Sequence, residues 1–361
     1  MNTRLWIVVG GGGVGKTTTS AALGVTFAKQ GRRSLVITVD PARRLADALG
    51  VQLGVEATRV QIGGVNLDAR MPDSRRSVDH FVDWLWVDAD ARKRVRDNPM
   101  YRELGDALAG VHELVSLAVL ERDVQSGMYD DVILDTAPSR HALELFDYPQ
   151  KLIKMLDERT LRFMIGLARI AGAALEQRPD ESRLFAWGKR RAGALVSHLV
   201  GETAIINIAA LFVELEAARE RWLALVQSVR TRLESRNTRY LVIAAPSGAA
   251  LDDAAYLCSE LTQRRSKPTA LIINRTHPAR DPWPQLDPAD PLQDIVMSLQ
   301  RDSERLGAQT QTAFERVRSF PNTGASVASL PAVAAVDPTQ VLLALAEHLG
   351  AQSWLNPSAA R

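Results

Sequence analysis

The chain has 361 residues, enough for one large domain or two small ones, and its composition of 46% hydrophobic and 24% charged residues is that of an ordinary globular protein. A formal net charge of +2 gives no electrostatic reason to expect nucleic acid as a partner. The single cysteine, Cys258, excludes a disulfide within the chain and a metal site built from several thiolates. A lone cysteine also fits a reducing cytosol, so we expect a cytoplasmic protein and leave peripheral attachment to a membrane open.

The first part of the chain predicts strands and helices in alternation. Leu5–Val9 is a short β-branched run that stops at glycine, which favours a buried strand, and Thr17–Gln30 is expected to form the helix that follows. Ser34–Val39 predicts a second buried strand. After it, Asp40 and Pro41 are expected to open a helix as its N-cap and its first residue.

The same alternation continues in the rest of the chain. Further strands are expected at Asp131–Leu134, Tyr240–Ala245 and Thr269–Ile273, with helices near residues 249–264, 292–317 and 341–349. Strands that alternate with helices in this way predict an α/β fold with a doubly wound, mostly parallel sheet.

Two long stretches without a convincing strand interrupt this pattern. We expect them to form an inserted helical subdomain, residues 73–125 and 142–235, beside a discontinuous P-loop nucleotide-binding domain of residues 1–72, 126–141 and 236–361. Helices that are apolar on more than one face either form ordinary core or offer a surface to a hydrophobic client. The side chains concerned are Leu161, Phe163, Met164, Ile165, Leu167, Ile170, Ile205, Ile206, Leu211 and Phe212.

Residues 10–17 match the eight-residue phosphate-loop pattern Gly-x-x-x-x-Gly-Lys-Ser/Thr, between a predicted strand and a predicted helix. The glycines allow successive backbone N–H groups to point at phosphate, and the helix adds the positive end of its dipole. We expect Lys16 to contact the β- and γ-phosphates and Thr17 to bind Mg²⁺. The motif therefore predicts ATP or ADP as a ligand, with further contacts from Gly12, Gly13, Val14, Gly15 and Thr18.

Two aspartates at the ends of predicted strands complete the expected reaction centre. Asp40 follows the second strand, where ligands gather in such sheets, so it is our candidate for orienting the attacking water; it also fits a simple helix cap. Asp135 ends the strand that contains Val132, Ile133 and Leu134, and is expected to support Mg²⁺ through Thr17 or a water.

The candidates for contacting the base are less specific. Asn274 closes the fifth strand, and its side-chain amide offers both a donor and an acceptor for the edge of adenine. Pro246, after the fourth strand, is placed to line the same pocket. Asparagine and proline are common at strand ends, so the residues alone leave a purely structural role open at both positions.

These motifs together resemble the ArsA-type ATPases, which include the arsenical-pump ATPase and the guided-entry targeting ATPase for tail-anchored membrane proteins. The resemblance rests on GGVGKTT in the phosphate loop, VDPARRLAD at residues 39–47, DTAPS at 135–139 and IINR at 272–275, in the family's order over most of the chain. The paired arginines of the second motif, with NRTHP at 274–278, are most similar to a bacterial branch of the family. The resemblance implies that Asp40 activates water, that Asn274 contacts adenine, that two such chains share an interface near the nucleotide, and that the helical subdomain handles a client.

Three departures from the family's pattern limit what the resemblance implies. The family's loop carries a lysine at the position of Gly11, which reaches across the dimer to the partner's phosphates; Arg43 or Arg44 is a candidate replacement. A chain with only Cys258 cannot form the Cys-x-x-Cys zinc clip of the eukaryotic targeting ATPases, so we expect no zinc. Arsenite capture needs several thiolates, so we expect no arsenite either.

The sequence leaves competing functions open. The first is a Mg²⁺-dependent ATPase that cycles between conformations to handle a hydrophobic client, as a homodimer or as a heterodimer with an ArsA-like relative. The second is a nucleotide-binding regulatory subunit of a heteromer with little turnover of its own, which the missing lysine at Gly11 favours. A third, a chromosome- or septum-positioning ATPase, fits the long helical insertions poorly.

Overall fold

The computed structural model describes residues 3–40, 42–72, 74–99, 101, 111–137, 146–147, 159, 166, 202–277, 283, 286–287, 290–320 and 324–355. The chain divides into two compact units. The first comprises residues 1–72, 122–144 and 232–361, and the second comprises residues 73–121 and 145–231.

The first unit is built around an eight-stranded sheet in the order β3-β4-β2-β5-β1-β6-β7-β8. Every neighbouring pair is parallel except β3 and β4. This arrangement confirms the predicted α/β class with a mostly parallel sheet. The strands are β1 Arg4–Gly10, β2 Ser34–Thr38, β3 Thr58–Ile62, β4 Val65–Arg70, β5 Asp131–Asp135, β6 Thr238–Ala244, β7 Pro268–Thr276 and β8 Ser326–Pro331.

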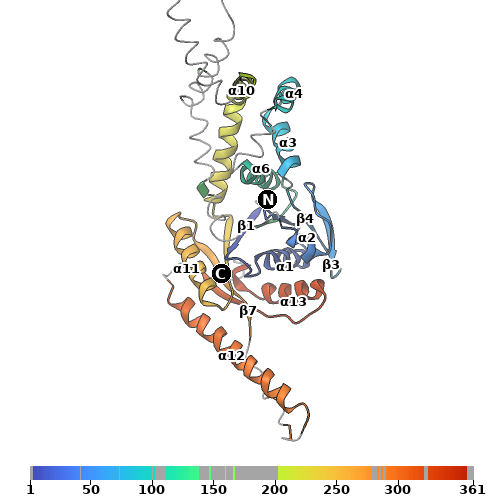
Figure 1. Ribbon diagram of the computed structural model, residues 1–361, viewed down its shortest axis with the longest axis vertical. Helices are drawn as coiled ribbons and strands as arrows, with labels where there is room; N and C mark the ends of the chain where they lie inside the picture. Colours follow the sequence, from blue (N-terminus) through green and yellow to red (C-terminus); the bar gives the residue numbers. More distant parts are fainter. Residues whose placement is uncertain are drawn as a thin grey trace, which may run out of the picture. The chain divides into compact units, whose positions relative to one another are not determined.

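Helices cover the sheet because the central strands are apolar on both faces. Trp6 and Val8 of β1 belong to one buried cluster with residues of α1 Lys16–Lys29 and α13 Pro338–Gly350, which lie side by side (Figure 1). Side chains alternate along a strand, so Leu5, Ile7 and Val9 of β1 face the opposite side. There α11 Gly248–Gln263 packs on β1, β6 and β7. The next helix along the chain is α12 Gln293–Arg318.

The edge hairpin of β3 and β4 was not predicted from the sequence. Gly63 and Gly64 join the two strands, with φ values of 56° and 82°. Two consecutive left-handed residues suit the tight turn between antiparallel strands, and glycine adopts that conformation at low cost. The Gly-Gly pair was therefore the available signal for this hairpin.

The helix expected to open at Asp40 and Pro41 begins later than predicted. The short helix α2 spans Arg44–Leu49, and its N-cap is Arg43. The Asp40 carboxylate instead accepts a hydrogen bond from the Ala42 backbone N–H at 2.9 Å. Asp40 thus orders a turn before the helix, a use of its side chain that competes with helix capping.

The described part of the second unit is helical. It includes α3 Ser74–Leu85, α4 Ala89–Asp97, the first part of α6 Val111–Gln125 and most of α10 Glu202–Leu233. Phe81 packs edge-on against Trp222, with ring centroids 5.1 Å apart, and the Trp86 indole donates to the Glu214 carbonyl. Among the described residues, no helix has both the length and the apolar character needed to cross a bilayer.

The apolar surface expected for a client lies mostly outside the described residues. This holds for Leu161, Phe163, Met164, Ile165, Leu167 and Ile170, and for the side chains of Ile205 and Ile206. Within α10, Leu211 is buried and Phe212 is half-buried. The division of the chain into a nucleotide-binding domain and a client-handling subdomain therefore stays a proposal.

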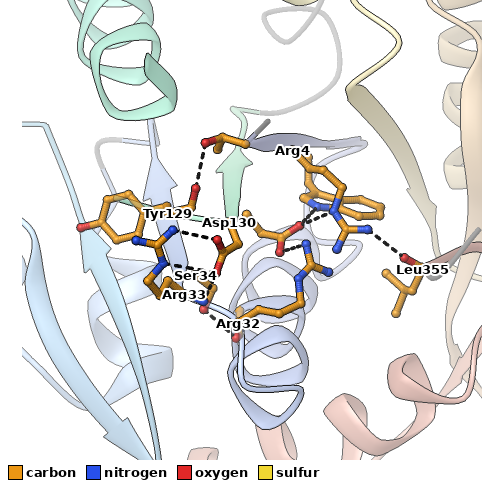
Figure 2. A network of polar contacts seen from close by, with 11 residues as sticks. Arg4, Arg32, Arg33, Ser34, Tyr129, Asp130 and Leu355 are labelled. Carbon is orange, nitrogen blue, oxygen red and sulfur yellow. Dashed lines mark hydrogen bonds and ion pairs between the residues drawn. The ribbon is translucent and has the colours of Figure 1, made fainter. Parts of the chain in front are cut away.

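A network of polar contacts closes the amino end of the sheet (Figure 2). The Asp131 carboxylate accepts hydrogen bonds from Arg4 Nε at 3.0 Å and from the Trp6 indole at 2.7 Å, and it forms an ion pair with Arg32. Arg4 also donates to the Leu355 carbonyl at 3.4 Å, which ties the last described residue to the first strand.

Candidate functional site

The predicted phosphate loop connects β1 to α1 at the carboxyl edge of the sheet. Gly13 and Gly15 have φ values of 72° and 94°, in the left-handed region that only glycine enters readily. Gly10 lies against β6, where an added Cβ would come within 2.4 Å of the Ile243 carbonyl oxygen. The backbone of this loop therefore requires glycine at positions 10, 13 and 15.

Lys16 is the first residue of α1 and folds back over the loop. Its ammonium donates hydrogen bonds to the Gly10 carbonyl at 3.1 Å and to the Gly11 carbonyl at 2.8 Å. Burial lowers the pKa of Lys16, and the nearby charges of Asp135 and Asp40 oppose that shift. A buried cation held by carbonyl oxygens is well placed to exchange them for phosphate oxygens, which attract it more strongly.

Asp135 lies at the centre of the polar cluster and is fully buried. One carboxylate oxygen accepts from the Thr17 hydroxyl at 2.8 Å and from the Thr38 hydroxyl at 3.0 Å, and Ser20 lies 3.5 Å from the other. Burial raises the pKa of Asp135 to about 6, although the Thr17 and Thr38 hydrogen bonds and the charge of Lys16 act in the opposite direction. This carboxylate is surrounded mainly by neutral donors, so its charge is incompletely balanced.

Asp40 stands beside this cluster at the end of the β2 segment, with 13% of its side chain exposed. Its Oδ2 lies 3.4 Å from Arg44 Nη1, and its backbone N–H donates to the Thr38 hydroxyl at 3.2 Å. Thr38 therefore connects the backbone of Asp40 to the carboxylate of Asp135. Both Arg43 and Arg44 are exposed, and the Arg44 side chain is 59% accessible.

Asn274 reaches the phosphate loop from the end of β7. Its side-chain amide donates to the Val14 carbonyl at 2.8 Å, and the residue is buried. Pro246 is half-buried, two residues beyond the end of β6 at the same edge of the sheet. Asn274 thus contacts the loop directly. Pro246 is placed near the loop only by its position after β6, at the same edge of the sheet.

The space next to Gly11, where the resemblance led us to look for a lysine, is occupied by another residue's side chain. A Cβ added to Gly11 would lie 2.8 Å from a carboxylate oxygen of Asp253, which projects from the first turns of α11. A lysine at position 11 would require Asp253 to shift. No sequence motif links these two residues, which are far apart in the chain.

The structure joins Lys16, Thr17 and Asp135 into one cluster, with Asp40 next to it. The loop residues Gly12, Gly13, Val14 and Gly15 precede α1, and Thr18 lies half-buried in its first turn. Sequence reasoning missed Thr38, Ser20 and Asp253, because none belongs to a distinctive motif. Their roles follow only from through-space contacts with Asp135 and Gly11.

The donor set fits Mg²⁺, a hard cation that prefers oxygen ligands. The Thr17 hydroxyl and an Asp135 carboxylate oxygen are 2.8 Å apart, and the carboxylate lacks a full counter-charge. Among the described residues, no three His, Cys, Asp or Glu side chains group closely enough to hold a metal by themselves. Such a site suits Mg²⁺ held jointly by protein oxygens, phosphates and waters, which is this ion's usual mode of binding.

Comparison with known proteins agrees with this geometry. The model of the Anion-transporting ATPase family matches residues 3–177. ATPase GET3 of Mycosarcoma maydis is 29% identical over 282 residues, or 77% of this chain and 75% of the relative. ATPase get3 of Schizosaccharomyces japonicus is 35% identical over 176 residues, and ATPase ASNA1 homolog 1 of Paramecium tetraurelia 37% over 157. These last two matches cover 48% and 43% of this chain, and 51% and 47% of the relatives.

Proposed function

Because the chain belongs to the ArsA-type ATPase family, and is accordingly an ATPase, we propose that it hydrolyses Mg²⁺-bound ATP at the loop of residues 10–17. The observation that carries this proposal is the hydrogen bond between Thr17 and the buried Asp135, beside the ammonium of Lys16. Together these groups offer a cation for phosphate and oxygen ligands for Mg²⁺.

Each residue of the cluster has a distinct part in this proposal. Lys16 leaves the carbonyls of Gly10 and Gly11 and binds the β- and γ-phosphates. Thr17 and Asp135 would hold Mg²⁺, and the bound ion would supply positive charge that offsets the charge on the transferring phosphoryl group. Asp40 orients the attacking water, because its carboxylate is partly exposed and keeps lone pairs beyond those used by Ala42 and Arg44.

Thr38 supports a conformational cycle. Its hydroxyl donates to Asp135 and accepts from the Asp40 backbone, so a change at the metal ligand reaches the segment that holds the proposed water. Loss of the γ-phosphate would remove the group that Asp40 faces and release this segment. We propose that the second unit couples this cycle to a hydrophobic client such as a membrane-protein segment, in a homodimer or a heterodimer with an ArsA-like relative.

A second candidate function is a regulatory subunit that binds nucleotide with little turnover. Gly11 supports it, since a lysine that reaches into a partner's site is missing and Asp253 fills the space. Steady-state hydrolysis by the lone chain, with and without its relative, separates the two functions. Brisk turnover by the lone chain excludes the regulatory role. Hydrolysis that appears only with the relative, and that persists when this chain carries Asp40→Asn, favours it.

The proposed function is tested by two substitutions with different expected results. Lys16→Ala removes the cation that meets the phosphates, so ATP affinity should fall by about tenfold or more. Asp40→Asn should leave ATP affinity nearly unchanged and lower the hydrolysis rate, because its role concerns only the water. Titration calorimetry and a phosphate-release assay measure the two effects, and equal ATP affinity in the wild type and Lys16→Ala would refute nucleotide binding by this loop.

A further inference from the structure

Asn274 occupies a position that the resemblance assigns to adenine, yet its side chain is already engaged elsewhere. One N–H of the amide is donated to the Val14 carbonyl at 2.8 Å, within the phosphate loop. Asn274 itself is only 4% exposed. Its observed partner is therefore the loop that receives phosphate, which suggests a role independent of the base.

The backbone at the end of β7 directs the Asn274 side chain toward the phosphate loop. The pairing of β7 with β8 shifts register between Asn274 and Thr276, and Arg275 between them has a φ of 59°. This bulge leaves Arg275 exposed while Asn274 and Thr276 are both buried. Thr276 donates to the Leu330 carbonyl at 3.0 Å on β8, so the two buried residues on either side of Arg275 bond to different parts of the protein.

The hydrogen bond from Asn274 to the Val14 carbonyl fixes the orientation of the peptide group between Val14 and Gly15. A trans peptide is planar, and its C=O and N–H point in opposite directions. Fixing the Val14 carbonyl toward Asn274 therefore directs the Gly15 N–H away from β7. In a phosphate loop such N–H groups must point at the bound phosphates.

Gly15 shows how closely the two segments approach. Its φ of 94° already favours glycine, and an added Cβ would lie 2.2 Å from Asn274 Nδ2. A side chain at position 15 would thus displace the amide that holds the preceding carbonyl. Position 15 therefore requires glycine for two reasons: its positive φ, and the lack of space for a side chain beside Asn274.

We propose that Asn274 is a positioning residue for the phosphate loop, which holds the Val14 carbonyl outward so that the Gly15 N–H faces the phosphates. The inference rests on the proposed function, since it concerns the same nucleotide site. It differs from adenine recognition in what it affects: the loop and the phosphates, whatever base is attached.

The first test compares a ligand that has a base with one that has none. In the Asn274→Ala variant, the affinities for Mg²⁺-ATP and for Mg²⁺-bound inorganic tripolyphosphate should fall by the same factor, about fivefold, as expected for one lost hydrogen bond. Thr276→Val is the matched control, because it removes a hydrogen bond from the same bulge without touching the loop. It should change neither affinity. A loss confined to ATP would assign Asn274 to adenine and overturn the proposal.

The second test needs no ligand. Hydrogen exchange of the peptide that covers residues 10–17 should be faster by about fivefold in Asn274→Ala and in the nearly isosteric Asn274→Asp, and unchanged in Thr276→Val. Unchanged exchange in both Asn274 variants would refute the positioning role even if tripolyphosphate bound too weakly to measure. Failure of the wild type to bind ATP would instead refute the proposed function, so the two failures are distinguishable.

Discussion

The single strand β5 begins and ends with an aspartate, and the two have opposite surroundings. Asp131 and Asp135 are both fully buried, and burial raises the pKa of each to about 6. Asp131 lies at the amino edge of the sheet and Asp135 at the carboxyl edge. The same residue type, on the same strand, is thus used in two different ways.

Asp131 has its charge balanced within the protein. Arg4 and Arg32 both pair with it (Figure 2), and the Trp6 indole donates to it. The Arg32 guanidinium also lies 4.8 Å from the centre of the Phe27 ring. These contacts tie β1, the turn before β2 and Leu355 to the base of the sheet. We interpret the network as a structural one, because two guanidinium groups of the protein already contact this carboxylate.

Asp135 has no permanent cation in contact with it among the described residues. It is held by the hydroxyls of Thr17 and Thr38, and the nearest ammonium, that of Lys16, donates to loop carbonyls instead. A buried carboxylate without a full counter-charge is costly to the folded chain. At the carboxyl edge of the sheet, the negative charge of Asp135 is not fully neutralised by cations of the protein. This is where we expect an external cation and a nucleotide to bind.

The largest expected effect comes from removing a positive charge that pairs with Asp131 at the amino edge of the sheet. Arg32→Gln leaves Asp131 with less counter-charge in a buried site, so we expect a loss of about 3 kcal/mol in the free energy of unfolding at about pH 7.5. The loss should shrink near pH 5, because Asp131, with a pKa of about 6, then holds a proton. Chemical denaturation at the two pH values measures both quantities.

The neighbouring residue supplies a matched control for that experiment. Arg33 pairs with Asp130 at 2.8 Å on the surface, so Arg33→Gln should change stability little. Equal losses from Arg32→Gln and Arg33→Gln, or a loss that does not depend on pH, would contradict the account of Asp131 as a compensated buried charge.

The next prediction is a gain in stability rather than a loss. Folded Asp135 keeps its proton up to about pH 6, whereas its unperturbed pKa is 3.8, so the folded chain binds more protons between these values and its stability falls as the pH rises. Asp135→Asn cannot ionise, and we expect the ligand-free variant to exceed the wild type by on the order of 2 kcal/mol above pH 6 and to match it near pH 4.

The same substitution should abolish the increase in ATP affinity that Mg²⁺ gives the wild type. Thermal and chemical unfolding without nucleotide, followed by calorimetry with and without Mg²⁺, tests both halves of this prediction. A ligand-free Asp135→Asn chain that is less stable than the wild type at pH 7 would show that the Asp135 charge is already compensated.

The smallest expected effect concerns one hydroxyl. Thr38→Val removes a hydrogen bond to Asp135, so we expect a loss of about 1 kcal/mol at about pH 7.5 that diminishes below pH 6 as Asp135 takes up its proton. It also removes the acceptor of the Asp40 N–H, so the hydrolysis rate should fall.

Thr136→Val is the control for this experiment. Thr136 is a buried threonine that donates to the Val8 carbonyl at 2.7 Å and does not contact Asp135 through this hydroxyl. Its loss of stability should not change across pH 6. Identical pH profiles for the two variants would argue against a specific link between Thr38 and the titration of Asp135.

Local features of the sequence were sufficient for much of the fold. The strand before Gly10, the loop glycines, Lys16 and the following helix are contiguous, so their spacing predicted the loop and its flanking elements. The buried runs that end in Asp40, Asp135 and Asn274 predicted parallel strands whose carboxyl ends meet at one edge. The roles of the individual site residues follow from these positions and stay predictions until the variants are measured.

Other features depended on contacts between residues far apart in the chain. The sequence singled out Asp135 at the carboxyl end of β5, but it did not show how Asp131 is paired, because the arginines that contact Asp131 come from position 4 and from the turn before β2. The Asn274 amide meets Val14 only because β7 lies two strands from β1, and the helix expected at Asp40 begins later because its carboxylate accepts from Ala42. The residue types at the strand ends can be read from the sequence. The charges, hydroxyls and carbonyls around each of them depend on the tertiary structure, because electrostatic balance and hydrogen bonding depend on distance in space.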